Sequence, residues 1–146
     1  MIAQSKLIVP DTFPRFSLSR LIKTVFNPTA GERVAILIDL DDPQEIKDFE
    51  FLKNPDLTVQ KYAYEVFYQG LKKGVLKELN LTGGDIFAYK ITGGSNLDLP
   101  DTAVAPEGNE LSFEKDIYPN YKLILCISTY SATAPLTAFA KKYDAV

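Results

Sequence analysis

Two short apolar runs constrain the fold of this chain most strongly. Residues 34–38 read Val-Ala-Ile-Leu-Ile, and residues 123–127 read Leu-Ile-Leu-Cys-Ile, with no charged side chain in either run. A strand with water on one face alternates apolar and polar residues, whereas an unbroken run is typical of a strand covered on both faces, as in a parallel sheet. The two runs therefore predict buried strands in an α/β fold.

Amphipathic patterns at helical spacing flank these runs. The first helix is predicted from its cap, Ser17, to Phe26, and the turn residues 27–32 end it. The longest helix is expected over residues 58–79, with Gly70 and Gly74 allowing a close approach to the sheet, and a last helix begins near Pro135. The predicted core-facing side chains are Leu18, Leu21, Ile22, Val25 and Phe26; Val59, Tyr62, Ala63, Val66 and Phe67; and Leu136, Phe139, Ala140 and Tyr143.

The remaining segments complete an alternating order. Residues 41–57 are predicted as a loop with one short helical turn, residues 85–91 as a strand nearer an edge, and residues 93–119 as a long irregular stretch. The order helix, strand, helix, strand, loop, strand, helix predicts one α/β domain over residues 1–146, in a three-layer, Rossmann-like arrangement with a small, mostly parallel sheet. Because the alternation calls for another strand after the last helix, we expect the N-terminal part of a longer two-domain protein.

The composition narrows the chemistry that these residues can perform. The chain contains no histidine, so it cannot assemble a Ser-His-Asp or Cys-His site, or a zinc site of the usual kind. The net charge of −3 and the absence of a basic cluster argue against nucleic acid as a partner. Cys126 is the only cysteine and is expected to be a buried thiol. No apolar run reaches the length of a membrane span, and no signal peptide is recognisable, so we expect a cytoplasmic location and no membrane partner.

Polar side chains follow the two buried strands. Asp39 and Asp41 come directly after the first strand, and Ser128 and Thr129 follow the last one. The carboxyl ends of parallel strands are the usual ligand-binding edge of α/β folds, and carboxylates facing hydroxyls could hold Mg²⁺ and a phosphate there. The phrase Asp39-Leu40-Asp41 resembles the first motif of haloacid-dehalogenase-type phosphotransferases, in which the first aspartate is the nucleophile. The alternative interpretation is a solvated acidic loop in which Asp39 or Asp41 caps a turn.

Two further features are candidates for binding. Gly93 and Gly94, with Asn96 close behind, could present backbone N–H groups to an anion, although a tight turn explains the same residues. A second apolar stripe lies beside the core face of the long helix and could dock another domain or subunit, or be covered by residues 93–119. This stripe, called the tyrosine stripe below, consists of Tyr64, Tyr68, Leu71 and Val75.

Several segments together resemble the N-terminal domain of the aminopeptidase T family, the leucyl-aminopeptidase-type metallopeptidases. They are a helix that leads into Asn27-Pro28-Thr29-Ala30-Gly31-Glu32-Arg33-Val34, a glycine-containing helix and strand that enter Thr92-Gly93-Gly94-Ser95, and the final strand, Ser/Thr turn and helix. The resemblance extends over residues 16–146.

The resemblance implies a non-catalytic domain. Family members are two-domain enzymes that release N-terminal amino acids with a pair of divalent metal ions, whose ligands and catalytic tyrosine lie in the C-terminal domain. No catalytic, cofactor or metal ligand of the family can be placed on a residue of this chain. The domain is then expected to shape the substrate cleft and to pack on the catalytic domain, with a homodimer as a further expectation.

Overall fold

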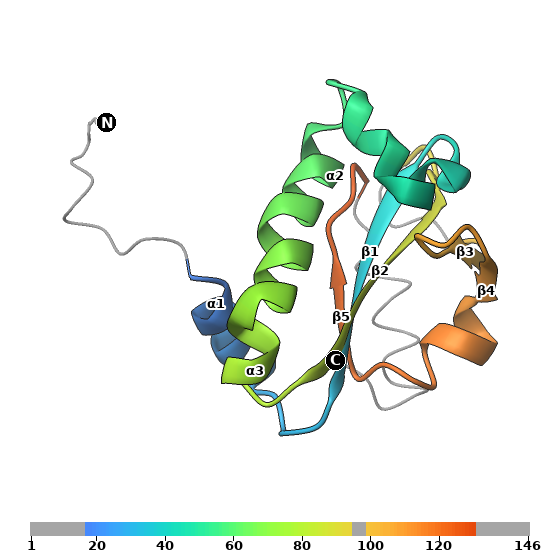
Figure 1. Ribbon diagram of the computed structural model, residues 1–146. Coiled ribbons are helices and arrows are strands. Elements are labelled where there is room, and N and C mark those ends of the chain that lie inside the picture. The colour runs from blue at the N-terminus through green and yellow to red at the C-terminus, as the bar shows by residue number, and fades with distance from the viewer. Residues whose placement is uncertain (1–16, 95–98, 131–146) are drawn as a thin grey trace, which may run out of the picture.

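The computed structural model describes residues 17–94 and 99–130, and its centre is a mixed β-sheet (Figure 1). The five strands of the described sheet lie in the order β4-β3-β2-β1-β5. Their bounds are Arg33–Leu40 for β1, Thr82–Lys90 for β2, Thr102–Val104 for β3, Glu110–Ser112 for β4 and Leu123–Cys126 for β5. The predicted α/β class is therefore confirmed.

The sheet differs from the prediction in its strand directions. β1 pairs in parallel with β2 and with β5, but β2–β3 and β3–β4 are antiparallel pairings. A mostly parallel sheet is thus not confirmed. The reason is a hairpin of two three-residue strands inside the segment predicted to be irregular, whose turn is closed by a hydrogen bond from Gly108 N to Ala105 O (2.8 Å). This hairpin lies beside β2, so β2 is the central strand of the described sheet and not an edge strand.

The first helix forms as predicted. α1 spans Leu18–Phe26, and the hydroxyl of its cap, Ser17, accepts a hydrogen bond from Arg20 N at 3.3 Å. The helix ends at Asn27, whose left-handed backbone (φ 45°) is typical of a helix C-terminus. A turn then leads directly into β1.

The segment between β1 and the long helix contains more helix than predicted. η2, Pro43–Lys53, consists of two short 3₁₀ turns joined through Asp48 and Phe49, whose φ angles are 53° and 57°. Such positive φ angles are uncommon for residues other than glycine. Phe49 packs against the long helix that follows.

The long helix follows as predicted and is built from four successive stretches: α2 (Thr58–Tyr62), η3 (Ala63–Tyr68), η4 (Leu71–Val75) and α3 (Leu76–Glu78). The η3 and η4 stretches are π-helical, and the backbone departs from helical angles at Gly74. A Cβ on Gly70 would lie 2.8 Å from Leu18 Cδ2, whereas one on Gly74 would have no neighbour within 4 Å. The close approach is therefore between this helix and α1 at Gly70, and not with the sheet.

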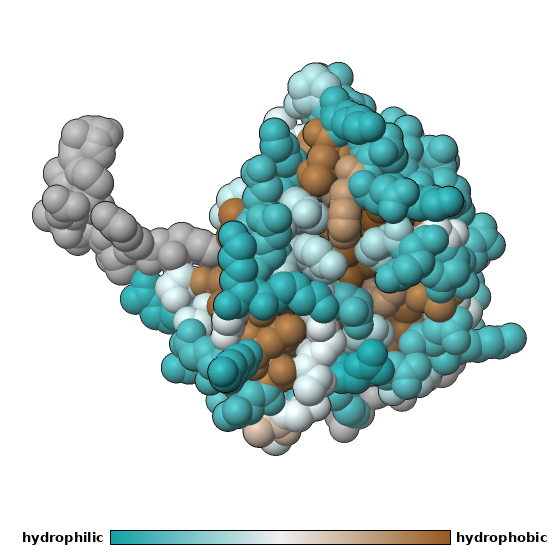
Figure 2. Space-filling view, viewed as in Figure 1, coloured by the Kyte–Doolittle hydropathy of each residue, from teal (hydrophilic) through white to brown (hydrophobic). Residues whose placement is uncertain are grey.

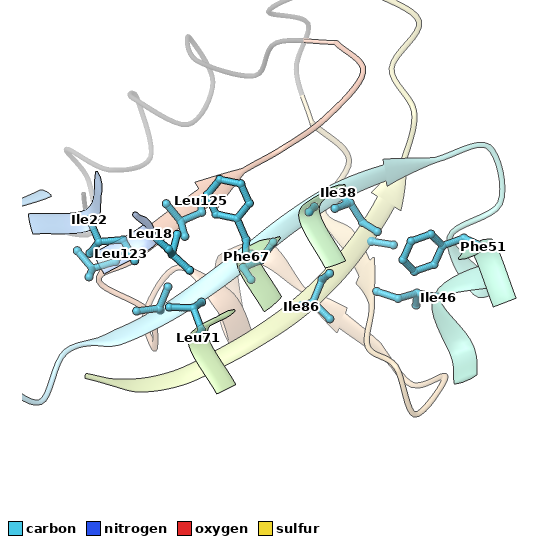
Figure 3. Close-up of a cluster of buried hydrophobic side chains, with 14 of the residues drawn as sticks. Leu18, Ile22, Ile38, Ile46, Phe51, Phe67, Leu71, Ile86, Leu123 and Leu125 are labelled. Carbon is cyan, nitrogen blue, oxygen red and sulfur yellow. The ribbon is translucent and has the colours of Figure 1, made fainter. Parts of the chain in front are cut away.

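Two hydrophobic clusters cover the two faces of the sheet. Even-numbered residues of β1, such as Val34 and Ile36, pack with α1, η2 and the long helix. Figure 3 shows this larger cluster, in which Ile38 is the labelled residue of β1. Odd-numbered residues, Ala35 and Leu37, pack instead with the short helix η5, Phe113–Ile117. β1 is therefore covered on both faces, as its apolar run predicts.

The core face of the long helix is rotated from the predicted one. Ala63 is buried as expected, but Val59 and Tyr62 are 38% and 47% exposed, and Gln60 is buried in their place. In α1, Val25 is 60% exposed, although its helical spacing predicts a core position. The predicted helix after Pro135 lies outside the described residues.

Candidate functional site

The carboxylate of Asp39 is buried at the carboxyl end of β1. Asp39 is 1% exposed, and its Oδ1 accepts hydrogen bonds from Gln60 Nε2 at 2.7 Å and Thr129 N at 2.8 Å. Its Oδ2 accepts a third bond, from Tyr130 N at 3.3 Å. A buried carboxylate is costly unless donors replace its water. These three bonds offset that cost and fix the segments that supply them.

Gln60, which the sequence analysis did not select, links these segments. Its Nε2 also donates to Asp39 O at 2.9 Å and to Thr129 Oγ1 at 2.8 Å. Two amide hydrogens serve three acceptors, so one hydrogen is shared between two of them. Gln60, Asp39 and Thr129, called the Asp39 cluster below, therefore join β1, α2 and the segment after β5. The residues next to Gln60 in the sequence do not indicate that this polar side chain is buried.

Ser128 and Asp41 were also predicted to lie at this edge. Within the described part of the chain, neither is hydrogen-bonded to the carboxylate of Asp39. The Ser128 hydroxyl donates to the carbonyl of Tyr130 at 2.6 Å. Asp41 and Asp42 are exposed, and the Asp42 carboxylate caps η2 by accepting a bond from Gln44 N at 3.0 Å. Within residues 17–94 and 99–130, no three cysteine, aspartate or glutamate side chains gather closely enough to hold a metal ion.

The thiol of Cys126 lies beside this edge on the opposite face of the sheet from the long helix. Its Sγ is 3.6 Å from Tyr89 Oη and 3.5 Å from Ser128 Oγ. Burial raises the pKa of this thiol and also raises the pKa of the Tyr89 hydroxyl. Both groups therefore stay protonated at neutral pH, as expected for a structural thiol.

The glycine pair forms a local turn. Gly93 has φ +82°, and a Cβ added to it would have no neighbour within 4 Å. Thr92 Oγ1 donates to Gly94 O at 2.9 Å, so the hydroxyl satisfies a carbonyl of the turn. Asn96 lies outside the described residues.

The tyrosine stripe is covered in part by η2, and Tyr68 also lines a cavity together with Ala105, Pro106 and Glu107 from the 93–119 segment. The Phe49 ring lies 4.7 Å from the Tyr64 ring and 5.6 Å from the Tyr68 ring, which stack on each other at 5.5 Å. Leu71 is fully buried in the main cluster, so it is not part of an exposed surface, and Val75 packs against the same cluster.

A second polar cluster, which the sequence analysis also missed, lies at the opposite end of the parallel strands. Tyr121 Oη donates to Asp85 Oδ2 at 2.5 Å and accepts from an Arg33 nitrogen at 3.2 Å. The Arg33 guanidinium also lies over the Tyr121 ring, 4.5 Å from its centre, and 3.7 Å from Asp85. Burial, followed by the hydrogen bond to Asp85, raises the pKa of Tyr121.

Comparisons with protein-family models, with curated proteins and with solved structures gave no match. Among the described residues, no helix combines the length and the apolar character needed to cross a bilayer.

Proposed function

We propose that this chain is a non-catalytic α/β domain of an aminopeptidase T-like metallopeptidase, which shapes the substrate cleft and packs on a catalytic domain. The observation that carries the proposal is the Asp39 cluster. The carboxyl ends of β1 and β5 form the edge where α/β folds usually bind ligands. At this edge the buried carboxylate accepts hydrogen bonds from three N–H donors. This arrangement supports a structural role, in which Asp39 keeps the ends of β1 and β5 in fixed positions.

The order of the elements supports the resemblance on which this proposal also depends. The phrase ending in Gly31-Glu32-Arg33 leads into β1, and β2 leads into Gly93 and Gly94, as in the family pattern. Under this proposal the domain is three-layered and Rossmann-like, with the long helix on one face of the sheet and η5 on the other. The protein is cytoplasmic, and its partner is a catalytic domain that holds the divalent metal ions.

Asp39→Asn tests the scaffold role. The variant keeps one acceptor oxygen but places an amide N–H₂ where a carboxylate oxygen accepts a bond, so we expect a lower melting temperature. Asp41→Asn is the matched control, because Asp41 is exposed. This variant should have the same melting temperature as the wild type. Neither the wild type nor the variants should hydrolyse leucine p-nitroanilide with Mn²⁺, Co²⁺ or Zn²⁺. Metal-dependent turnover by the wild-type chain that Asp39→Asn abolishes would overturn the proposal.

A second candidate function is a Mg²⁺-dependent phosphotransferase that uses Asp39 and Asp41. The observation that favours it is the 2.8 Å bond between Asp39 Oδ1 and Thr129 N, which brings together the first-strand aspartate and the later hydroxyl residue. A cation that binds only the folded state must stabilise it. This function therefore predicts that Mg²⁺ raises the melting temperature of the wild type but not of Asp39→Asn. An unchanged melting temperature would exclude it.

A further inference from the structure

The long helix has an exposed apolar face on the side that points away from η2. Val59 and Tyr62 lie there, one turn apart, and they are two of the three large apolar side chains that the described residues expose. Tyr64, about half a turn further around the helix, and Tyr68 lie on the other side, against Phe49 of η2. Figure 2 shows an apolar band on that other side, between the long helix and the hairpin. Within the described part of the chain, η2 therefore covers one side of the helix and leaves Val59 and Tyr62 exposed.

The chain enters α1 beside this face. In Figure 1, α1 lies against the long helix on the side away from the hairpin. Leu18, the first residue of α1, packs on the long helix at Gly70, where its Cδ2 would lie 2.8 Å from an added Cβ. Leu18 and Phe67 belong to the same buried cluster (Figure 3), and the Phe67 ring lies 5.8 Å from the Tyr62 ring. From Gly70 back to Tyr62 the helix advances about 12 Å, at about 1.5 Å per residue, so this is the distance that a segment preceding Ser17 must cross.

The sequence before Ser17 contains the apolar side chains that this face needs. Residues 1–16 lie outside the described part of the chain, and among them Phe13 directly precedes Pro14, with Phe16 two residues later. An extended chain advances at most about 3.5 Å per residue, so Phe13 reaches about 14 Å from Ser17, far enough to meet Tyr62. Proline restricts its own backbone and that of the preceding residue, so less conformational entropy is lost when this segment is bound. In a polyproline conformation residues three apart return to the same side, which lets both phenylalanine rings face the helix together.

The charges of the two surfaces are complementary. Glu65 is exposed one turn after Tyr62, and it forms no ion pair among the described residues. Arg15 stands between the two phenylalanines in the sequence. Lys61, the other charged residue of α2 and η3, is about half a turn from Val59 around the helix. An arginine that arrives with the N-terminal segment therefore meets a carboxylate on this face and not a cation.

We propose that this face is the docking site of the N-terminal segment of the same chain. The segment covers the two exposed apolar side chains with Phe13, and Arg15 pairs with Glu65. The same turn of the helix carries Gln60, which donates to Asp39 O at 2.9 Å, so the docked segment also braces the Asp39 cluster. The inference does not depend on the function proposed for the Asp39 edge.

NMR spectroscopy of the full chain tests the contact directly. We expect nuclear Overhauser effects between the Val59 methyl groups and the ring protons of Phe13. Phe13→Ser should abolish them and shift the amide resonances of Val59 and Tyr62. Val25, the third exposed apolar side chain, is the matched control, and its resonances should stay in place. A wild-type chain without Overhauser effects between Val59 and Phe13 would overturn the proposal, and this result does not depend on whether the variant folds.

Two other occupants of the face would give different results. Overhauser effects that appear only between labelled and unlabelled chains in a mixed sample would assign the face to a second copy. Effects from Val59 to Phe139 or Tyr143 would assign it to the C-terminal segment. Either result would overturn the proposal.

Charge reversal tests the position of the segment. Arg15→Glu should move the Val59 resonances part of the way toward their positions in Phe13→Ser, because two carboxylates then face each other. Adding Glu65→Lys should return the resonances toward those of the wild type, whereas adding Lys61→Glu should not. The effect should be partial, since an exposed ion pair contributes little to stability. Equal effects of the two added changes would overturn the proposed position.

Discussion

Replacing Gln60 with glutamate tests the Asp39 cluster directly. The change is nearly isosteric, but it places a carboxyl oxygen where Nε2 now lies 2.7 Å from Asp39 Oδ1. Two buried carboxylates at this distance cannot both ionise, so the pair must keep one proton in the folded state. In the unfolded chain the introduced carboxyl ionises at its ordinary pKa of about 4.3.

The cost follows from this difference. Holding a proton at pH 7 against a pKa of about 4.3 costs about 3.7 kcal/mol, at 1.36 kcal/mol per pH unit. The single O–H of the protonated carboxyl replaces the bond to Asp39 Oδ1, but not the bonds to Thr129 Oγ1 and Asp39 O. Loss of the second amide hydrogen adds about 1 kcal/mol. We therefore expect Gln60→Glu to lower the free energy of unfolding by about 4 to 5 kcal/mol at pH 7.

The stability of the Gln60→Glu variant should depend on pH in a definite direction. The folded variant binds more protons than the unfolded one between the two pKa values, so its stability falls as pH rises through that range. Urea unfolding of wild type and variant should show a difference that shrinks to about 1 to 1.5 kcal/mol at pH 4. Gln69→Glu, on the same helix, is the control and should show no such trend. A difference that stays the same from pH 4 to pH 7 would refute the described contact between Gln60 and Asp39.

Three other predictions can be checked by urea or thermal unfolding. Gly83 has φ +79°, and an added Cβ would lie 2.9 Å from a backbone oxygen, whereas Gly31 has φ +89° with open space around it. Gly31→Ala should therefore cost about 1 to 2 kcal/mol and Gly83→Ala at least about 1 kcal/mol more; equal costs would contradict the close approach. Leu71→Ala should cost about 2 to 5 kcal/mol because Leu71 is fully buried, whereas Val25→Ala, at a 60% exposed site, should cost under about 0.5 kcal/mol. Because burial raises the pKa of Tyr121, its hydroxyl stays protonated in the folded state above the pH near 10 where unfolded tyrosine ionises, so stability should fall as pH rises past that point. Tyr121→Phe should reduce this alkaline loss, and an unchanged slope between pH 9 and pH 11 would contradict the assignment.

The local elements of this fold were predictable because their signals are local. The cap at Ser17, the helical spacing that follows it and the apolar run of β1 each determine an element without help from distant residues. The β3–β4 hairpin has no such signal. Its strands have three residues each, too few to show alternation, and they are held by pairing to β2 and to each other.

Only the part of the candidate site that lies at the ends of the strands was predictable from the sequence. Asp39 and Thr129 were expected to meet, because parallel strands bring their carboxyl ends to one edge. The burial of Gln60 was not predictable, because it depends on acceptors 21 and 69 residues away in the chain. The cover over Tyr64 and Tyr68 was missed for a similar reason, since it depends on a left-handed backbone at Phe49 that its sequence does not indicate.

The most direct test of the proposed function is to read the gene beyond the codon for Val146. We predict that the reading frame continues into a second domain rich in histidine, glutamate and aspartate, the side chains that a pair of divalent metal ions requires. A stop codon directly after Val146 would contradict the assignment of this chain as the scaffold domain of a metallopeptidase.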